Sequence, residues 1–339
     1  MRHAWRTLAR SLVVPLALVC APASAATPFY EGKTVTVIVG NPAGSGYDAY
    51  ARLLTRHMGK HLAGAPTFVV QNMPGAGSII AAQHLANVAP KDGTAFGLVV
   101  PGALFDPLID GPAKYRYAPD AFAVIGSADS GTRVCFTSAA SGVASVEDAR
   151  TRKVVVASTS PQSSATDYAL FMNALAGTKF EIVMGYKGPA DLLLALERGE
   201  AAGVCALDSA TLSAIRPDWV ETGKVKLLVQ HGLQPNESIK APPLWRFISD
   251  GDRAVAELIV SQQEFSRPYL APPGTPPAQV KLLREAFMAT MKDPELVAEA
   301  DKMRIGVAAK SGEEIEAVLR KMYATSPELV QRARQILRP

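Results

Sequence analysis

Two glycine-rich segments of this sequence can bind an anion without a charged side chain. Residues 42–48 (Pro-Ala-Gly-Ser-Gly-Tyr-Asp) and residues 74–78 (Pro-Gly-Ala-Gly-Ser) each lie between a β-branched run and an amphipathic stretch. The first amides of a helix have no partner within the helix, its N-terminus is positive, and glycine lets a ligand approach the backbone. We therefore expect a site for a small carboxylate at these turns. The residues expected to contact it are Gly44, Ser45, Gly46, Tyr47, Asp48, Gly75, Ala76, Gly77 and Ser78.

Tight backbone packing and dinucleotide binding are the two other interpretations of these glycines. Residues 44–49 match the G-x-G-x-x-A pattern of a dinucleotide-binding turn, but Tyr47 and Asp48 would place bulk and negative charge against a pyrophosphate. Residues 75–80 lack the final small residue of the pattern. We therefore expect no cofactor.

A serine- and threonine-rich segment, residues 158–164, also joins a strand-like run to a helix. Its hydroxyl groups and amides can face the same ligand from the opposite side. The candidates are Ser158, Thr159, Ser160 and Ser163. The alternative is that a serine of this segment only caps the following helix.

Residues typical of catalysis or metal binding do not form a recognisable pattern. His57 and His61 are four apart on an expected helix, but they lack the glutamate of H-E-x-x-H and a third ligand, so we expect them to face solvent. The nucleophile motif G-x-S-x-G is absent. We expect neither catalytic residues nor a metal site. A secreted hydrolase is the alternative, and it would need a histidine beside a serine of the cleft.

Cys135 and Cys205 each lie within an apolar, strand-like run. They can be two buried thiols, or a disulfide if the chain matures in an oxidising compartment.

The elements that would position these residues alternate between strands and helices in two successive groups, which is typical of parallel α/β sheets. Residues 34–39, 68–71, 95–100, 154–157, 180–184, 203–207 and 225–229 are expected strands, and 48–61, 78–88, 167–176 and 190–198 are expected helices. Residues 101–120 are a looser connection, and the proline-rich 269–277 is expected to be irregular. Helices follow at 278–291, 294–302 and 312–324, the last with Ser311 and Glu314 as a capping box, and we expect them to pack on the first lobe.

These elements predict two lobes, one of residues 26–124 and about 231–339 and the other of residues 125–230. The chain would cross between them near 124–137 and near 208–230.

The N-terminus has the three regions of a secretory signal peptide. Arg2, Arg6 and Arg10 precede the apolar run 11–20, and a small-residue site follows, so we expect cleavage after Ala25 and a periplasmic location. The whole chain has a formal charge of +4, and removal of these three arginines leaves +1. Such a balance does not indicate a nucleic-acid partner.

Taken in order, several segments resemble the receptors of tripartite tricarboxylate transporters, the Bug family of extracytoplasmic solute receptors. The resemblance runs through residues 34–52 with the first glycine loop, residues 70–77 with the second, and the turn 89–94. The turn at Tyr186 to Gly188 and the Ala-Pro-Pro-Gly-Thr-Pro run 271–276 are similar to two further signatures.

This resemblance implies a type II periplasmic-binding fold, with two α/β lobes that close on a ligand and are joined by crossover strands. It implies that Tyr186, Gly188 and Asp208 join the serine loop in facing the ligand, a small carboxylate. It also implies a monomer that delivers this ligand to a membrane permease, or, alternatively, to a signalling protein.

The sequence departs from the family pattern at Ser45, Met73 and residues 262–267. These departures bear on the identity of the ligand more than on the fold. Within the last segment, Glu264 and Arg267 can be ligand contacts or can pair with each other, and we expect the pair.

Overall fold

The computed structural model describes residues 27–339. The expected signal peptide at 1–25 and its cleavage site lie outside the described residues. Within residues 27–339, no helix is both long and apolar enough to cross a membrane.

The first lobe is built on a six-stranded sheet of order β11-β4-β10-β3-β1-β2. Its strands are β1 (Thr34–Val39), β2 (Thr67–Asn72), β3 (Ala95–Leu98), β4 (Ala123–Ser127), β10 (Pro268–Ala271) and β11 (Lys310–Ser311). β1 is parallel to both β2 and β3, whereas β10 is antiparallel to β3 and β4. The carboxyl ends of β1, β2 and β3 therefore share one edge, and both glycine loops begin there.

Helices cover both faces of this sheet, which explains why β1 is apolar at consecutive positions. Val37 and Val39 pack with helices α1 and α9, while Ile38 between them belongs to the apolar cluster on the other face with α2 and α11. The helices are α1 (Gly46–Met58), α2 (Ile79–Asn87), α9 (Pro277–Met291), α10 (Pro294–Met303) and α11 (Gly312–Tyr323). The predicted capping box of Ser311 and Glu314 is present at the start of α11.

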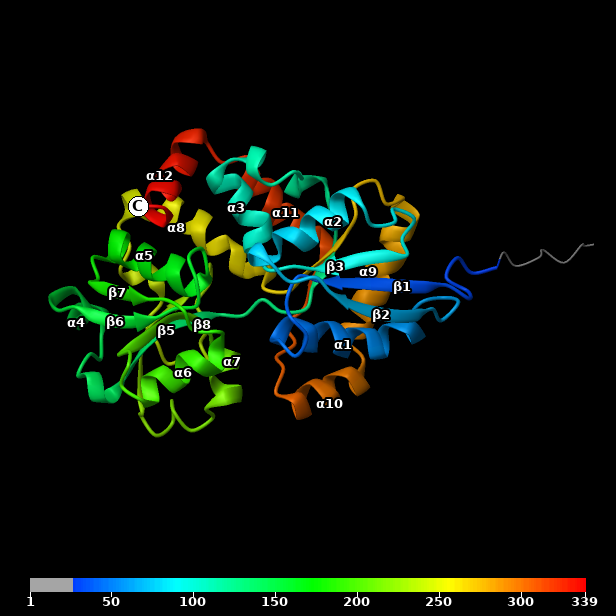
Figure 1. Ribbon diagram of the computed structural model, residues 1–339. Coiled ribbons are helices and arrows are strands. Elements are labelled where there is room, and N and C mark those ends of the chain that lie inside the picture. The colour runs from blue at the N-terminus through cyan, green and yellow to red at the C-terminus, as the bar shows by residue number, and fades with distance from the viewer. Residues whose placement is uncertain (1–26) are drawn as a thin grey trace, which may run out of the picture.

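The second lobe has a five-stranded sheet of order β7-β6-β8-β5-β9. Its strands are β5 (Arg133–Ser138), β6 (Val154–Ala157), β7 (Phe180–Val183), β8 (Gly203–Asp208) and β9 (Val225–His231), and its helices are α4 (Val146–Thr151), α5 (Ser164–Ala176), α6 (Pro189–Glu197) and α7 (Ser209–Ile215). The two lobes lie side by side, with residues 128–132 crossing directly from β4 to β5 (Figure 1).

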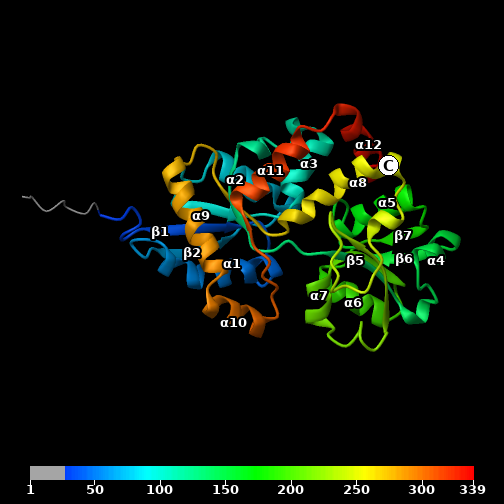
Figure 2. The same cartoon turned by 180° about the vertical axis from the view of Figure 1, so that it is seen from behind.

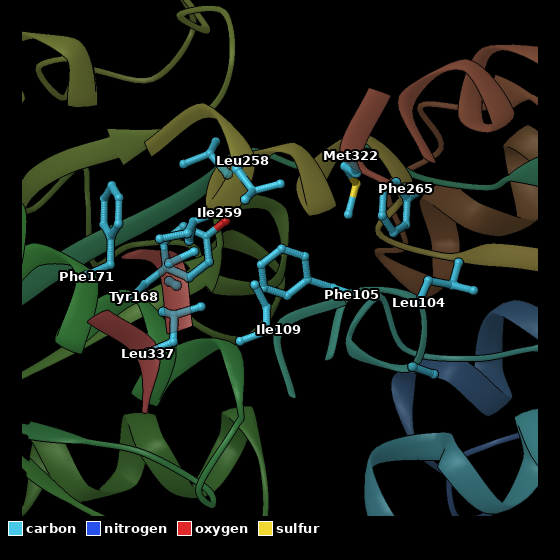
Figure 3. Packing of buried hydrophobic residues seen from close by; sticks show 14 of the residues in the cluster. Leu104, Phe105, Ile109, Tyr168, Phe171, Leu258, Ile259, Phe265, Met322 and Leu337 are labelled. Carbon is cyan, nitrogen blue, oxygen red and sulfur yellow. The ribbon is translucent and has the colours of Figure 1, made fainter. Parts of the chain in front are cut away.

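Three helices lie where the lobes meet, along one side of the molecule (Figure 1, Figure 2). They are α3 (Gly102–Asp110), α8 (Arg253–Val260) and α12 (Pro327–Leu337). α12 packs against α3, α5 and α8. Side chains of these elements form one apolar cluster, in which Phe105 and Ile109 of α3 approach Leu337 of α12 and Tyr168 of α5 (Figure 3).

Single turns of 3₁₀ helix connect many of these elements. They are Gly59–His61, Ala76–Ser78, Pro112–Lys114, Pro119–Ala121, Ala139–Ser141, Leu244–Arg246, Asp250–Asp252 and Ser261–Phe265.

The prediction of two α/β lobes is confirmed, and most predicted elements agree within a few residues. The prediction of irregular structure over residues 269–277 is confirmed for residues 272–276 but wrong at its start, because Pro268–Ala271 is the central strand β10. A proline can begin a strand, and the run of prolines that breaks it starts only at Pro272. The sequence did not predict helices α3, α4, α7, α8 and α12.

The predicted lobe boundaries, 26–124 with about 231–339 against 125–230, stay a prediction. The strands of the second sheet span residues 133–231, and the chain rejoins the first sheet at residue 268.

Candidate functional site

A cleft of about 660 Å³ lies between the two lobes. Its walls come from the strand ends and loops of both sheets and from Gln262, Ser266 and Arg267 of the returning crossover. Of the residues predicted from sequence, Tyr47, Ala76, Gly77, Thr159, Ser160, Ser163 and Asp208 line this cleft. The other predicted residues are not part of this lining: Gly44, Ser45, Gly46, Asp48, Gly75, Ser78, Ser158, Tyr186 and Gly188.

The Asp48 side chain holds the first glycine loop in place. The Asp48 carboxylate accepts hydrogen bonds from the Gly44 amide (2.8 Å), from Arg52 Nε (2.9 Å) and from Asn72 Nδ2 (3.0 Å). Burial opposes ionisation of Asp48, but these hydrogen bonds outweigh it and hold its pKa below its ordinary value. Ser45 caps helix α1 by accepting from the Asp48 amide at 3.3 Å. Asp48 therefore acts as a brace that links this loop to the end of β2.

The second glycine loop has left-handed backbone at four successive positions. The φ angles are 138° at Gly75, 45° at Ala76, 60° at Gly77 and 68° at Ser78. Non-glycine residues in this region carry strain, and such strain often occurs at functional sites. A Cβ atom added at Gly77 would meet no atom within 4 Å, so this glycine faces open space in the cleft.

Ser78 is buried and joins the ends of the first lobe's strands. Its hydroxyl donates to the Gly40 carbonyl oxygen at 3.1 Å and accepts from the Val100 amide at 3.2 Å. These contacts make Ser78 a support of the loop, with Ala76 and Gly77 exposed to the cleft above it.

The serine loop of the second lobe has a similar division of roles. Ser158 is fully buried and hydrogen-bonds with Ser163 (2.9 Å) and Thr166 (2.7 Å). Thr166 donates in turn to the Ser160 carbonyl oxygen at 2.8 Å, and Ser163 caps helix α5. This hydroxyl network holds the loop in place, while Thr159 and Ser160 line the cleft.

Of the three residues that the family resemblance adds, only Asp208 lines the cleft, whereas Tyr186 and Gly188 do not. The Tyr186 hydroxyl donates to Glu200 at 3.4 Å, its ring packs on the apolar cluster around α6, and Gly188 directly precedes that helix. Asp208 lines the cleft and caps helix α7 by accepting from the Thr211 amide at 3.0 Å.

Two arginines of the cleft were not predicted as site residues. Arg267 lies over the Tyr47 ring, with its guanidinium carbon 4.3 Å from the ring centroid. Arg133, at the start of β5, donates to the Ala206 carbonyl oxygen at 3.1 Å. The expected pairing of Glu264 with Arg267 is wrong, because Glu264 instead pairs with Lys310 on β11. The sequence could not indicate Lys310 as the partner of Glu264, because residue 310 reaches the site only through the pairing of β11 with β4.

A buried cluster of acidic residues adjoins the cleft at the junction of α3, α5 and the end of α12. Arg338 donates to Asp106 (3.0 Å) and to Asp167 (2.9 Å), and its Nε lies 3.4 Å from Asp110. Burial and the nearby Asp167 raise the pKa of Asp106 to about 8 despite its ion pair with Arg338. Burial likewise raises the pKa of Asp167 to about 6.

Asp129, in the crossover 128–132, is a second buried acid. Burial and then the charge of Asp208 raise its pKa to about 6.

Cys135 and Cys205 form a disulfide that links β5 to β8. Of the two alternatives from the sequence, the structure therefore has the disulfide and not two free thiols. Together with His231 the two cysteines are a group of three potential metal ligands within 4.8 Å of one another. Both sulfur atoms are used by the disulfide, and burial lowers the pKa of His231 to about 3.

The expectation that His57 and His61 face solvent is wrong. His57 hydrogen-bonds with Glu299 at 2.6 Å, and His61 hydrogen-bonds with Asp293 at 2.8 Å, both in the α10 region.

Comparisons with known proteins agree with this architecture. A model of the tripartite tricarboxylate transporter family receptor, TctC, matches residues 50–334. A protein of Cupriavidus necator described as the UPF0065 protein in the gbd 5' region is 27% identical over 293 residues, which is 82% of this chain and 81% of that protein.

Among solved structures, a TctC solute-binding protein from Polaromonas is similar with a TM-score of 0.68 and 23% identity, covering 89% of this chain and 99% of the other. A Rhodopseudomonas palustris protein with adipate has a TM-score of 0.66 and 20% identity, covering 89% and 97% of the two chains. MatC from the same organism, with bound malate, has a TM-score of 0.63 and 20% identity, covering 90% and 99%.

The family match extends over most of the chain, and the two lobes, the intervening cleft and the glycine loops are those expected of such a receptor. This chain therefore belongs to the tripartite tricarboxylate transporter receptor family, whose members are periplasmic solute-binding receptors and not enzymes.

Proposed function

We propose that this protein binds a small carboxylate in the cleft between its lobes and delivers it to the membrane permease of a tripartite tricarboxylate transporter. The observation that carries the proposal is the cleft of about 660 Å³ at which strand-to-helix loops of both lobes converge. A volume of this size suits a small organic molecule. Two proteins of the same fold contain malate and adipate, which supports a carboxylate as the ligand.

The proposed contacts divide into two groups. Ala76 and Gly77 offer backbone amides of the strained loop, and Thr159 and Ser160 offer polar groups from the other lobe. The remaining residues predicted from sequence, Gly44 to Asp48, Gly75, Ser78, Ser158, Ser163, Tyr186, Gly188 and Asp208, are proposed to shape these loops or to approach the ligand when the lobes close. We propose further that the mature chain acts as a periplasmic monomer.

A thermal-shift screen of organic acids tests the proposal. Malate, adipate, succinate and an aromatic acid are compared with a neutral sugar and with a divalent cation, each at several concentrations. A ligand that binds only the folded state stabilises it by about 2.7 kcal/mol at a concentration 100 times its Kd, so at least one acid should raise the melting temperature in a dose-dependent way. A shift with the sugar or the cation and with none of the acids would contradict carboxylate binding.

A further inference from the structure

Arg267 is a cationic side chain of the cleft wall whose position is set by aromatic rings. It follows the 3₁₀ helix Ser261–Phe265 and precedes β10, where the crossover returns to the first lobe. Its guanidinium carbon lies 4.3 Å from the centroid of the Tyr47 ring and 5.0 Å from that of Tyr50. Two aromatic faces therefore orient a planar guanidinium at the edge of the first glycine loop.

The hydrogen-bonding capacity of Arg267 is only partly used. Its Nη1 donates to the Ser266 carbonyl oxygen at 2.8 Å and to the Tyr47 hydroxyl at 3.3 Å. Its Nε is buried and has no hydrogen-bond partner in the described part of the chain. Among residues 27–339, no carboxylate oxygen comes within the 4.0 Å that defines an ion pair with this side chain.

The acidic residues around the cleft are occupied in other contacts. Asp106 and Asp167 hold Arg338, and Glu264, the nearest acid in sequence, pairs with Lys310. Asp208 uses one carboxylate oxygen to cap helix α7, and it acts on Arg267 only through its charge, as does the buried Asp129. An incompletely paired guanidinium that is shielded from water binds an anion more strongly than an exposed one does.

We propose that Arg267 is a specificity-determining residue that pairs with a second acidic group of the ligand. This inference rests on the proposed function and extends it to one residue. The first carboxylate would lie at the glycine loop of Ala76 and Gly77, and the second would accept hydrogen bonds from the Arg267 fork over the Tyr47 ring. Arg133, which also lines the cleft without an ion pair in the described residues, adds positive charge to the cleft.

This arrangement has a consequence for ligand choice. The backbone amides of the Ala76–Gly77 loop can donate to any carboxylate, so they do not distinguish a diacid from a monoacid. The Arg267 guanidinium does, because a monoacid would leave it unpaired while a diacid would satisfy it. The protein should therefore prefer diacids over monoacids of the same length, and Arg267 should be the origin of that preference.

The experiment compares matched pairs of acids by calorimetry: adipate with hexanoate, and succinate with butyrate. Three variants accompany the unsubstituted protein. Arg267→Met removes the guanidinium and keeps much of the apolar stem. Arg267→Lys keeps the charge without the fork. Arg253→Met is the matched control, because Arg253 also lies over an aromatic ring, that of Trp245 at 4.7 Å, but does not line the cleft.

We expect Arg267→Met to weaken binding of the preferred diacid by roughly 10- to 100-fold, the range for a hydrogen bond to a charged group, and to change binding of its monoacid partner by less than about threefold. Arg267→Lys should restore part of the preference, and Arg253→Met should leave it intact. Retained monoacid binding and an unchanged melting temperature without ligand show that the variant is folded.

Two results separate failure of this inference from failure of the proposed function. Equal loss for diacid and monoacid, or no loss for either, would overturn the role of Arg267 while leaving carboxylate binding in place. If the unsubstituted protein bound none of the acids, both proposals would be wrong.

Discussion

At the residue scale, the glycine loops show how a side chain can serve a binding site without facing it. Asp48 and Ser78 stand in the segments that predict an anion site, yet their polar atoms are used to hold neighbouring backbone. Ser158 does the same in the second lobe. Such internal hydrogen bonds fix the loops before a ligand arrives, which lowers the entropic cost of binding.

Gly77 provides the residue-scale prediction. A leucine in its place should block the cleft, because a side chain there projects into open space beside the proposed ligand. Binding of the best acid from the screen should weaken by at least about tenfold, equivalent to 1.4 kcal/mol, as measured by calorimetry.

Gly177→Leu is the matched control for this change. Gly177 has φ 71°, close to the 60° of Gly77, and an added Cβ would also meet no atom within 4 Å, but it follows α5 outside the cleft. Both variants should lose about 1–2 kcal/mol of stability to left-handed strain, and only Gly77→Leu should lose binding. If Gly77→Leu bound the acid as well as the unsubstituted protein does, the assignment of this loop to the binding site would be wrong.

At the element scale, the second sheet is stabilised by a covalent link as well as by packing. The disulfide joins β5 and β8 across a sequence separation of 70 residues. β5 is also the strand that continues from the crossover 128–132, and β8 ends at Asp208 in the cleft wall. The disulfide therefore ties the connection between lobes to one side of the binding site.

Replacement of both cysteines by alanine tests this element. In the chain-entropy model a closed loop of this length is worth about 4 kcal/mol, so Cys135→Ala/Cys205→Ala should be less stable by an amount of that order in urea unfolding under oxidising conditions. The unsubstituted protein unfolded with a strong reductant should approach the variant. Equal stability of the oxidised protein and the variant would show that the link contributes nothing.

At the scale of the whole molecule, the lobes are joined by more than their crossover segments. The apolar cluster of α3, α5, α8 and α12 spans the boundary, and Arg338 at the end of α12 bridges Asp106 of α3 and Asp167 of α5. Three carboxylates surround this one guanidinium. Burial disfavours the charged forms of Asp106 and Asp167, and the neighbouring carboxylates add to this effect, so the pKa of each lies above its ordinary value.

The buried acids Asp106 and Asp167, together with Asp129 of the crossover, predict a free energy of unfolding that falls as pH rises. An acid whose pKa is raised in the folded state binds protons more tightly when folded, so its stabilisation is complete below its ordinary pKa near 4 and is lost as pH rises through the folded value. With Asp106 at about 8, and with Asp167 and Asp129 at about 6, the free energy of unfolding should decrease between about pH 4 and pH 8.

Asp106→Asn should flatten this dependence. The substitution removes the buried carboxyl group with the highest pKa. The variant should therefore be more stable than the unsubstituted protein by about 1 kcal/mol or more at pH 8, and the two should have similar stability at pH 5. Urea unfolding at the two pH values measures this, with Asp301→Asn as an exposed control on α10. A loss of stability at pH 8 would mean that the ion pair with Arg338 outweighs the crowding of charge.

Much of the fold followed from sequence because its signals are local. Buried parallel strands carry consecutive apolar residues, as Val37, Ile38 and Val39 do in β1, helices such as Gly312–Tyr323 carry their own caps, and glycines mark the turns between them. Those patterns were sufficient to predict two α/β lobes, the family resemblance and the two loops whose tips, Ala76 and Gly77 on one lobe and Thr159 and Ser160 on the other, line the cleft.

Only the tertiary structure decided which polar groups support the cleft and which remain open to it. Asp48 is engaged by Asn72 from the next strand, Glu264 by Lys310, and Asp106 by Arg338 from the end of the chain. Each of these partners is brought into place by strand order or helix packing, over separations that no local pattern reports. The same long-range pairings leave Arg267 without an acidic partner in the described residues, and that is the feature of the site that sequence alone did not predict.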